Sequence, residues 1–211
     1  MADHRFFAAV YDRLSGPTEQ AGLAERRGRL LAEAHGRVLE IGGGTGLNLP
    51  HYRDVDQVTL LEPDGAMRRR LERRLGQSRV PVEVVATSLE DAGLAPGSFD
   101  TVVCTLVLCT VPDLPAALAT ISDVLRPAGR LLFLEHVVQP GWRGVIQRAA
   151  QPVWTRLTGG CHLDRDVPAA LRAAGFKVTD VERFDQPLAN PLVAAAATGQ
   201  ARPTATAAAR R

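Results

Sequence analysis

Cysteine is scarce in this chain of 211 residues, which contains only three, at positions 104, 109 and 161. An odd number at wide spacing matches neither a disulfide framework nor a zinc-binding motif, so the sequence predicts no bound metal ion. Reduced thiols are typical of intracellular proteins. The pattern therefore favours a cytoplasmic localisation.

Aromatic residues and long apolar runs are also few. Phe, Trp and Tyr make up 5% of the sequence, which argues against a stacking surface for nucleic acid, and no nucleic-acid partner is predicted. The N-terminus carries Asp3, His4 and Arg5 without a long apolar run behind them, unlike a signal peptide or a membrane anchor. The apolar run Leu192–Ala197 is too short to span a bilayer. We expect no integral membrane segment, and peripheral lipid contact stays open.

Positive charge is concentrated in one segment, although the formal net charge is only +2. Arginine occupies positions 68, 69, 70, 73 and 74. This cluster is either a patch for an acidic partner or the solvated face of a helix. Met67, Leu71 and Leu75 mark an apolar stripe at helical spacing in the same segment. The stripe favours the solvated helix face.

Short apolar runs alternate with helical patterns through the middle of the chain. Five runs have the character of strands: 37–41, 58–62, 82–86, 101–106 and 130–135. Helical patterns lie between several of them, as at 66–75 and 114–125. This alternation predicts an α/β fold with a parallel sheet and helices on both faces.

The flanking segments complete a single predicted domain, residues 1–211. Residues 1–35 are helical in pattern, with an interruption at Gly16-Pro17. The core is predicted over 36–200 and ends with a helix near 168–174, followed by strands near 177–183 and 192–197. Residues 201–211 are rich in Ala, Thr and Arg and show no pattern, so we expect a disordered tail.

A glycine-rich turn, Glu40–Gly46, ends the first predicted strand. Glycines let a ligand lie close to the backbone, and we expect a helix after the turn that offers free N–H groups. Glu62 follows Gly42 by 20 positions at the end of the second strand. A carboxylate there is suited to accepting hydrogen bonds from ribose hydroxyls, although a surface glutamate is the plainer alternative.

The turn departs from the dinucleotide fingerprint. Leu47 stands where the last glycine of G-x-G-x-x-G would fall, so the close packing that a pyrophosphate requires is not encoded. This departure favours a nucleoside cofactor without phosphates over a nicotinamide dinucleotide.

Four motifs resemble class I S-adenosylmethionine-dependent methyltransferases. They are Glu40–Gly46, Leu61–Asp64, Ser98–Val103 and Leu125–Leu131, in that order. The resemblance implies a Rossmann-like, mostly parallel sheet of seven strands with the last strand antiparallel. It also implies S-adenosylmethionine as cofactor and S-adenosylhomocysteine as product.

Three further segments narrow the resemblance: Val103–Pro112, Glu135–Val137 and Gly159–Asp166 are similar to the methyltransferase-like seven group. Its characterised members are membrane-anchored alkyl thiol methyltransferases, and this chain resembles a soluble relative. The preferred acceptor is therefore a lipophilic thiol. Phosphatidylethanolamine, another amine or a phenol are the alternatives, as is a protein that binds the cofactor without catalysis.

The resemblance also assigns residues to the cofactor. They are Glu40, Gly42, Gly44, Gly46, Asn48, Glu62, Pro63, Met67, Ser88, Leu89, Thr105 and Leu106. Ser88 departs from the family, many members of which carry Asp there to hold the adenine amino group, so recognition is expected to use the backbone at Leu89. Ala128 replaces the first glycine of the family's P-G-G turn.

Three residues are catalytic candidates. His136, at the end of the fifth strand, could take a proton from the acceptor near neutral pH, or could be a structural histidine. Tyr11 could close an N-terminal helical lid formed by residues 1–35, as in the family, or could be a core aromatic. Asp164, with His162 and Asp166, could cap the acceptor pocket.

Overall fold

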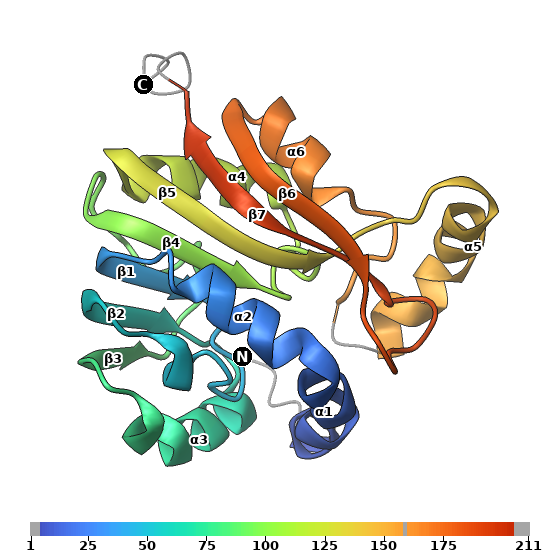
Figure 1. Cartoon of the computed structure of the whole chain (residues 1–211), viewed down its shortest axis with the longest axis horizontal. Coiled ribbons are helices and arrows are strands. Elements are labelled where there is room, and N and C mark those ends of the chain that lie inside the picture. The colour runs from blue at the N-terminus through green and yellow to red at the C-terminus, as the bar shows by residue number, and fades with distance from the viewer. Residues whose placement is uncertain (1–4, 158–159, 205–211) are drawn as a thin grey trace.

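The computed structural model describes residues 5–157 and 160–204. Seven strands form one sheet in the order β3-β2-β1-β4-β5-β7-β6 (Figure 1). Their bounds are β1 Gly36–Ile41, β2 Val55–Leu61, β3 Val82–Val85, β4 Phe99–Thr105, β5 Leu125–His136, β6 Phe176–Asp185 and β7 Ala195–Pro203. Strand β7 pairs antiparallel with both β5 and β6, whereas β1 to β5 pair in parallel. The predicted mostly parallel sheet with an antiparallel last strand is confirmed.

Helices cover both faces of the sheet, as predicted. Helix α2 (Ala24–Leu31) and helix α3 (Gly65–Arg74) pack on one face, where Leu30, Leu31 and Leu71 join a buried cluster with strand residues. Helices α4 (Leu114–Val124) and α6 (Val167–Ala173) cover the opposite face. Asp64, Asp113 and Asp166 cap the N-termini of α3, α4 and α6, and such caps stabilise a helix by about 1 kcal/mol each.

The N-terminal segment breaks elsewhere than predicted. Helix α1 (Arg5–Thr18) runs through Gly16 and Pro17, and a π-helical turn, η1 (Glu19–Leu23), joins it to α2. The kink lies at Gly22, whose φ of 125° is open to glycine at little cost. The expected interruption at Gly16-Pro17 is therefore wrong.

Two further segments differ from the expectation. The glycine turn leads only to a 3-10 turn, η2 (Leu49–His51), rather than a helix, since β2 begins at Val55 and leaves too few residues. The last strand is not 192–197 but Ala195–Pro203, so residues 201–203 belong to the sheet and not to a tail. Pairing of Leu131 with Ala201 places this alanine in the buried core. Residues 205–211 of the predicted tail lie outside the described residues.

Helix α5 (Gly141–Leu157) projects from the sheet edge near the end of β5 (Figure 1). The sequence patterns did not predict it. Several of its large apolar side chains are exposed: Trp142, Val145, Ile146 and Val153. Among the helices in the described ranges, none has the length and apolarity needed to cross a membrane.

Candidate active site

The carboxyl ends of the parallel strands meet at one edge of the sheet. Ile41 pairs with Leu61 and with Cys104, and Cys104 pairs with Phe133, so the segments after β1, β2, β4 and β5 start side by side. Ligands of open α/β sheets bind at this edge. The fold thereby brings the glycine turn, Glu62, Thr105 and His136 to one region.

The glycine turn requires glycine at three of its positions. Gly42, Gly44 and Gly46 have φ values of 67°, 56° and 85°, in the left-handed region that strains residues with a Cβ atom. A Cβ on Gly42 would also lie 2.5 Å from Val107 Cγ2. Gly42 is therefore packed against the protein, whereas a Cβ on Gly44 would meet only the Gly42 carbonyl, at 4.0 Å, so the backbone at Gly44 is open to a ligand.

Glu62 turns its carboxylate toward this loop. Its Oε2 accepts a hydrogen bond from the Gly44 N–H at 2.7 Å, and its Oε1 accepts one from the Asp64 N–H at 2.8 Å. Burial raises the pKa of Glu62, against the lowering effect of these two bonds. A buried carboxylate at the turn has the position that sequence spacing predicted.

Glu40 lies deeper and is fully enclosed. Its two oxygens accept hydrogen bonds from Asn48 Nδ2 at 2.8 Å and from the Tyr52 hydroxyl at 2.7 Å. Asn48 also donates to Thr105 Oγ1 at 3.0 Å and accepts from Arg27 Nη1 at 2.8 Å. Burial raises the pKa of Glu40 from 4.5 to about 7. Arg27 and Tyr52, which the sequence did not single out, complete this polar network.

The other predicted cofactor residues flank the same edge. Met67 is buried on α3 beside Ala66, and Pro63 precedes that helix, half-buried. Ser88 follows β3 and donates to Asp91 Oδ2 at 2.9 Å, so its hydroxyl supports the local turn. The Leu89 side chain is buried and packs with the core residues.

Helix α1 lies over the glycine turn. The Thr45 hydroxyl donates to Asp12 Oδ1 at 2.7 Å, and Arg74 donates to Thr45 Oγ1 at 2.7 Å and to Asp12 Oδ2 at 2.9 Å. Tyr11 packs on Ala66 and Met67. We call Asp12, Thr45 and Arg74 the latch. Arg74, assigned from sequence to a solvated face, instead ties the first helix to the turn.

The groove beneath this helix is narrow. Its cavity measures about 20 Å³ and is lined by Tyr11, Arg27, Glu40, Gly42–Thr45, Leu47, Asn48 and Thr105. That volume is about the space of one water molecule. Tyr11 of α1 forms part of this lining, and burial raises its pKa to about 12.

A second, larger cavity adjoins the groove. It measures about 390 Å³ and shares Tyr11 with the groove, while Leu106, next to the groove residue Thr105, lies in its wall. Its lining is mainly apolar, with Trp154 and Leu188 among the residues, and it includes Cys109, His136 and Cys161. We call it the acceptor cavity. Its size suits a small, mostly apolar molecule.

A buried glutamate shapes the loop that forms one wall of the acceptor cavity. Leu106 has a φ of 56°, unusual for a residue with a branched side chain. The chain then wraps around the Glu135 carboxylate, which accepts hydrogen bonds from the N–H groups of residues 107, 108 and 109 at 2.9, 2.8 and 3.2 Å. This bonding fixes Cys109 in the wall. No local sequence pattern indicates this bonding, because the partners are more than 25 residues apart.

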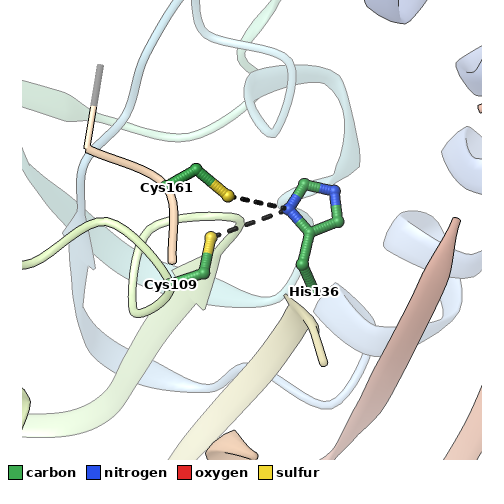
Figure 2. Close-up of side chains that lie close together, drawn as sticks. All are labelled: Cys109, His136 and Cys161. Atoms are coloured by element: carbon green, nitrogen blue, oxygen red, sulfur yellow. Dashed lines mark hydrogen bonds between the residues drawn. The ribbon is translucent and has the colours of Figure 1, made fainter. Parts of the chain in front are cut away.

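His136 points its Nδ1 atom at two sulfur atoms. Cys109 Sγ lies 3.7 Å away and Cys161 Sγ lies 3.9 Å away (Figure 2). A hydrogen bond from the Cys109 thiol lowers the pKa of Cys161, with His136 and Trp154 adding to the effect, and the same bond raises the pKa of Cys109. This corner of the cavity is therefore polar and suited to holding a thiolate.

The predicted polar cap is only partly present. Asp164 is exposed and does not line the acceptor cavity. Asp166 caps α6, and its carboxylate binds Arg183. His162 contacts Gln151 Nε2 at 3.0 Å, and its backbone N–H donates to the Cys109 carbonyl. The structure thus brings Tyr11 and His136 to the cavity but not Asp164.

Comparison with known proteins agrees with this geometry. A family model described as a methyltransferase domain matches residues 11–181. Two human proteins, thiol S-methyltransferases TMT1B and TMT1A, are 38% and 35% identical over 75% and 74% of this chain. The matches span 68% and 66% of those proteins, about two thirds of their length.

The fold is shared with solved structures. The Bacillus halodurans protein BH2331 superimposes with a TM-score of 0.70 at 15% identity, over 87% of this chain and 100% of that chain. At this identity the likeness concerns the fold alone.

Proposed function

Because this chain belongs to the methyltransferase domain family, we propose that it transfers a methyl group from S-adenosylmethionine to the sulfur of a small lipophilic thiol. The main observation that supports this proposal is the acceptor cavity, which is mainly apolar, has Cys109, His136 and Cys161 in its wall and lies next to the glycine turn. The name of the human relatives, thiol S-methyltransferase, supports the same acceptor.

We assign the cofactor to the glycine turn. Each carboxylate oxygen has two lone pairs, so Glu62 can accept bonds from both ribose hydroxyls while it keeps those from Gly44 and Asp64. Gly42, Gly44 and Gly46 present backbone at the same place. Glu40 and Asn48 suit the charged amino end of the cofactor, and Thr105 and Leu106 lie toward the acceptor cavity.

The adenine side of this assignment uses residues that flank Glu62. Met67 and Pro63 offer apolar surface, and the Leu89 backbone after β3 offers hydrogen bonds, with Ser88 holding that turn. The groove in its closed form is too small for a nucleoside. Entry therefore requires α1 to move, and Tyr11 would close over the bound molecule afterwards.

The chemistry divides between cofactor and protein. When bound, the cofactor supplies a methyl group that its positive sulfur already activates. The protein holds the acceptor in the apolar cavity, excludes water and manages one proton. A thiol has a pKa near 8.5, and the His136 imidazole, at the cavity wall, is placed to accept its proton.

Methyl transfer to matched acceptors tests this proposal. The protein is incubated with methyl-labelled S-adenosylmethionine and an alkyl thiol, an alkyl amine, a phenol and an alcohol of similar size, or with phosphatidylethanolamine vesicles. We expect label on the thiol alone. Label on phosphatidylethanolamine or an amine and none on the thiol would overturn the acceptor. Cofactor binding without label on any acceptor would identify a non-catalytic binding protein.

We also propose peripheral contact with lipid through α5. This helix exposes Trp142, Val145, Ile146 and Val153, carries Arg143, Arg148 and Arg156, and contains no acidic residue. A helix that combines exposed apolar and basic side chains lies well in an anionic membrane surface. Trp154 of the same helix lines the acceptor cavity. Contact of α5 with lipid would therefore bring the cavity close to lipophilic acceptors dissolved in the membrane.

A further inference from the structure

Three ligand-type side chains converge in the wall of the acceptor cavity. Cys109 Sγ, Cys161 Sγ and an imidazole nitrogen of His136 all lie within 4.8 Å of one another (Figure 2). They come from three separate places: the loop after β4, the end of β5 and the segment before α6. We propose that they bind a thiophilic divalent ion, Zn²⁺ in the first place, with its fourth position open to the acceptor cavity.

The distances are close to those of a tetrahedral zinc site. Bonds of about 2.3 Å to sulfur and about 2.0 Å to nitrogen place the sulfur and nitrogen ligands about 3.6 Å apart, and two sulfurs about 3.8 Å apart. His136 Nδ1 lies 3.7 Å and 3.9 Å from the two sulfurs. To surround an ion, the nitrogen–sulfur distances would need to change by a few tenths of an ångström. The sulfur–sulfur distance, which is at most 4.8 Å, would need to shorten by at most about 1 Å.

The loops that carry the two cysteines are fixed by bonds of their own. Three N–H groups that end at Cys109 bind the Glu135 carboxylate, and the N–H of His162 donates to the Cys109 carbonyl at 2.8 Å. The Cys161 carbonyl accepts a bond from Thr155 Oγ1 at 3.4 Å. Supporting bonds of this kind position ligands before an ion arrives.

The donor set also matches the ion in charge. Two thiolates and one neutral imidazole balance a divalent cation, so the loaded site carries no net charge into a mainly apolar cavity. Soft thiolate and imidazole ligands select zinc-like ions over Mg²⁺ and Ca²⁺. Zinc sites with three protein ligands keep a position for water or substrate, and here all three ligands line the cavity.

The consequence for the acceptor rests on the proposed function. An acceptor thiol would lose its proton to water, and its thiolate would displace the water in the fourth position. No oxidant or reductant is involved. Since a bound ion lowers the pKa of a coordinated thiol, the site would hold an acceptor sulfur deprotonated at neutral pH. His136 would then be a ligand, and the role of proton acceptor proposed above for His136 applies only to protein without the ion.

The three ligands are far apart in the sequence, so no sequence pattern predicted this cluster. The ligands are 27 and 25 residues apart, so no short zinc motif exists, and the prediction of no metal ion was made from that spacing. Only the pairing of β4 with β5 brings Cys109 and His136 together.

Cobalt titration tests the site directly. The full-length, chelator-treated and fully reduced protein is titrated with Co²⁺ without oxygen, and the thiolate-to-cobalt and tetrahedral visible bands are recorded. We expect one ion per chain, displaced by Zn²⁺. C161S and H136Q each remove a direct ligand and should weaken binding by more than about 100-fold, the upper range for loss of a supporting partner, whereas C104A, which alters the third cysteine, should not weaken it. Circular dichroism confirms that each variant is folded.

The outcomes separate this site from the methyltransferase proposal. Absence of a thiolate–cobalt band in reduced, folded protein would overturn the metal site, as would equal affinity in folded C161S. Recovery of a Cys109–Cys161 disulfide together with no ion uptake after reduction would overturn it too. Thiol methylation by protein that binds no ion would reject the site alone. Ion binding without methylation of any thiol would reject the acceptor alone.

Discussion

Glu40 shows at the scale of one residue how burial changes a carboxylate. Its side chain is 1% exposed and bonded to Asn48 and Tyr52, yet the desolvation of the charged form raises its pKa from 4.5 to about 7. The folded protein therefore binds a proton at Glu40 between these two pH values, where the unfolded chain has lost it. Neutral Glu40 favours the folded state, and ionised Glu40 opposes it.

The pH dependence of stability should follow from this shift. Glu40 contributes stability that is fully present below pH 4.5 and is lost as the pH rises through 7. The difference in the free energy of unfolding approaches about 3 kcal/mol at its upper limit. We expect E40Q to reduce the fall in stability between pH 5 and pH 8, measured by urea unfolding of cofactor-free protein. An equal fall in both proteins would contradict the assignment. E83Q, an exposed glutamate on β3, is the control.

The element that governs access is α1. Among its described side chains, Asp12 contacts the glycine turn through the latch, and Tyr11 packs on Met67. The charged groups of the latch are about one quarter to one third exposed, at 26% for Arg74 and 30% for Asp12. Contacts of this exposure are modest in energy, so the helix is held but free to open.

Loosening the latch should open the groove more often. We expect R74A to speed amide hydrogen exchange in α1 and the association of S-adenosylhomocysteine, each by about fivefold, since the lost contacts are worth about 1 kcal/mol. Hydrogen exchange with mass spectrometry and stopped-flow binding measure the two effects. The matched control is R73A, an exposed arginine on the same helix. Equal exchange in all three proteins would show that the latch does not restrain α1.

Elements were predictable where their signal is local. The strands that end before Gly42 and at Glu62 have apolar patterns of their own. The turn after the first strand is also recognisable from its glycines. The kink at Gly22 was missed because Gly16-Pro17 is the stronger punctuation in sequence, although helix α1 accommodates it. The end of β7 was missed because Ala201–Pro203 is a strand only through its pairing with β5 and β6.

At the scale of the whole molecule, the site also combines parts with a local sequence signal and parts that depend on long-range contacts. The glycine turn and Glu62 were predicted from the spacing between the ends of the first two strands, and the structure bonds them to each other. Cys109 and Cys161 were not predicted to meet, and Arg74 was not predicted to reach Asp12, 62 residues away. Contacts of this kind depend on the order of the strands, which no local pattern encodes.

At the same scale, α5 forms an exposed face beside the acceptor cavity. We expect the protein to sediment with vesicles that contain anionic lipid, and far less with neutral vesicles or at high salt, because three arginines lie on this helix. W142S/I146S should lose most of the binding to anionic vesicles while thermal stability is kept, since both side chains are exposed at 69% and 48%. Unchanged sedimentation of the double variant would exclude α5 as the contact.

Calorimetric titration with S-adenosylhomocysteine tests the central claim, that the glycine turn and Glu62 bind the cofactor. We expect one molecule bound per chain, and at least about 100-fold weaker binding in E62A, because two hydrogen bonds to a carboxylate are lost at about 1.5–3 kcal/mol each. E83A should bind as the wild type does. No heat with the wild-type protein, or equal affinity in folded E62A, would contradict the claim.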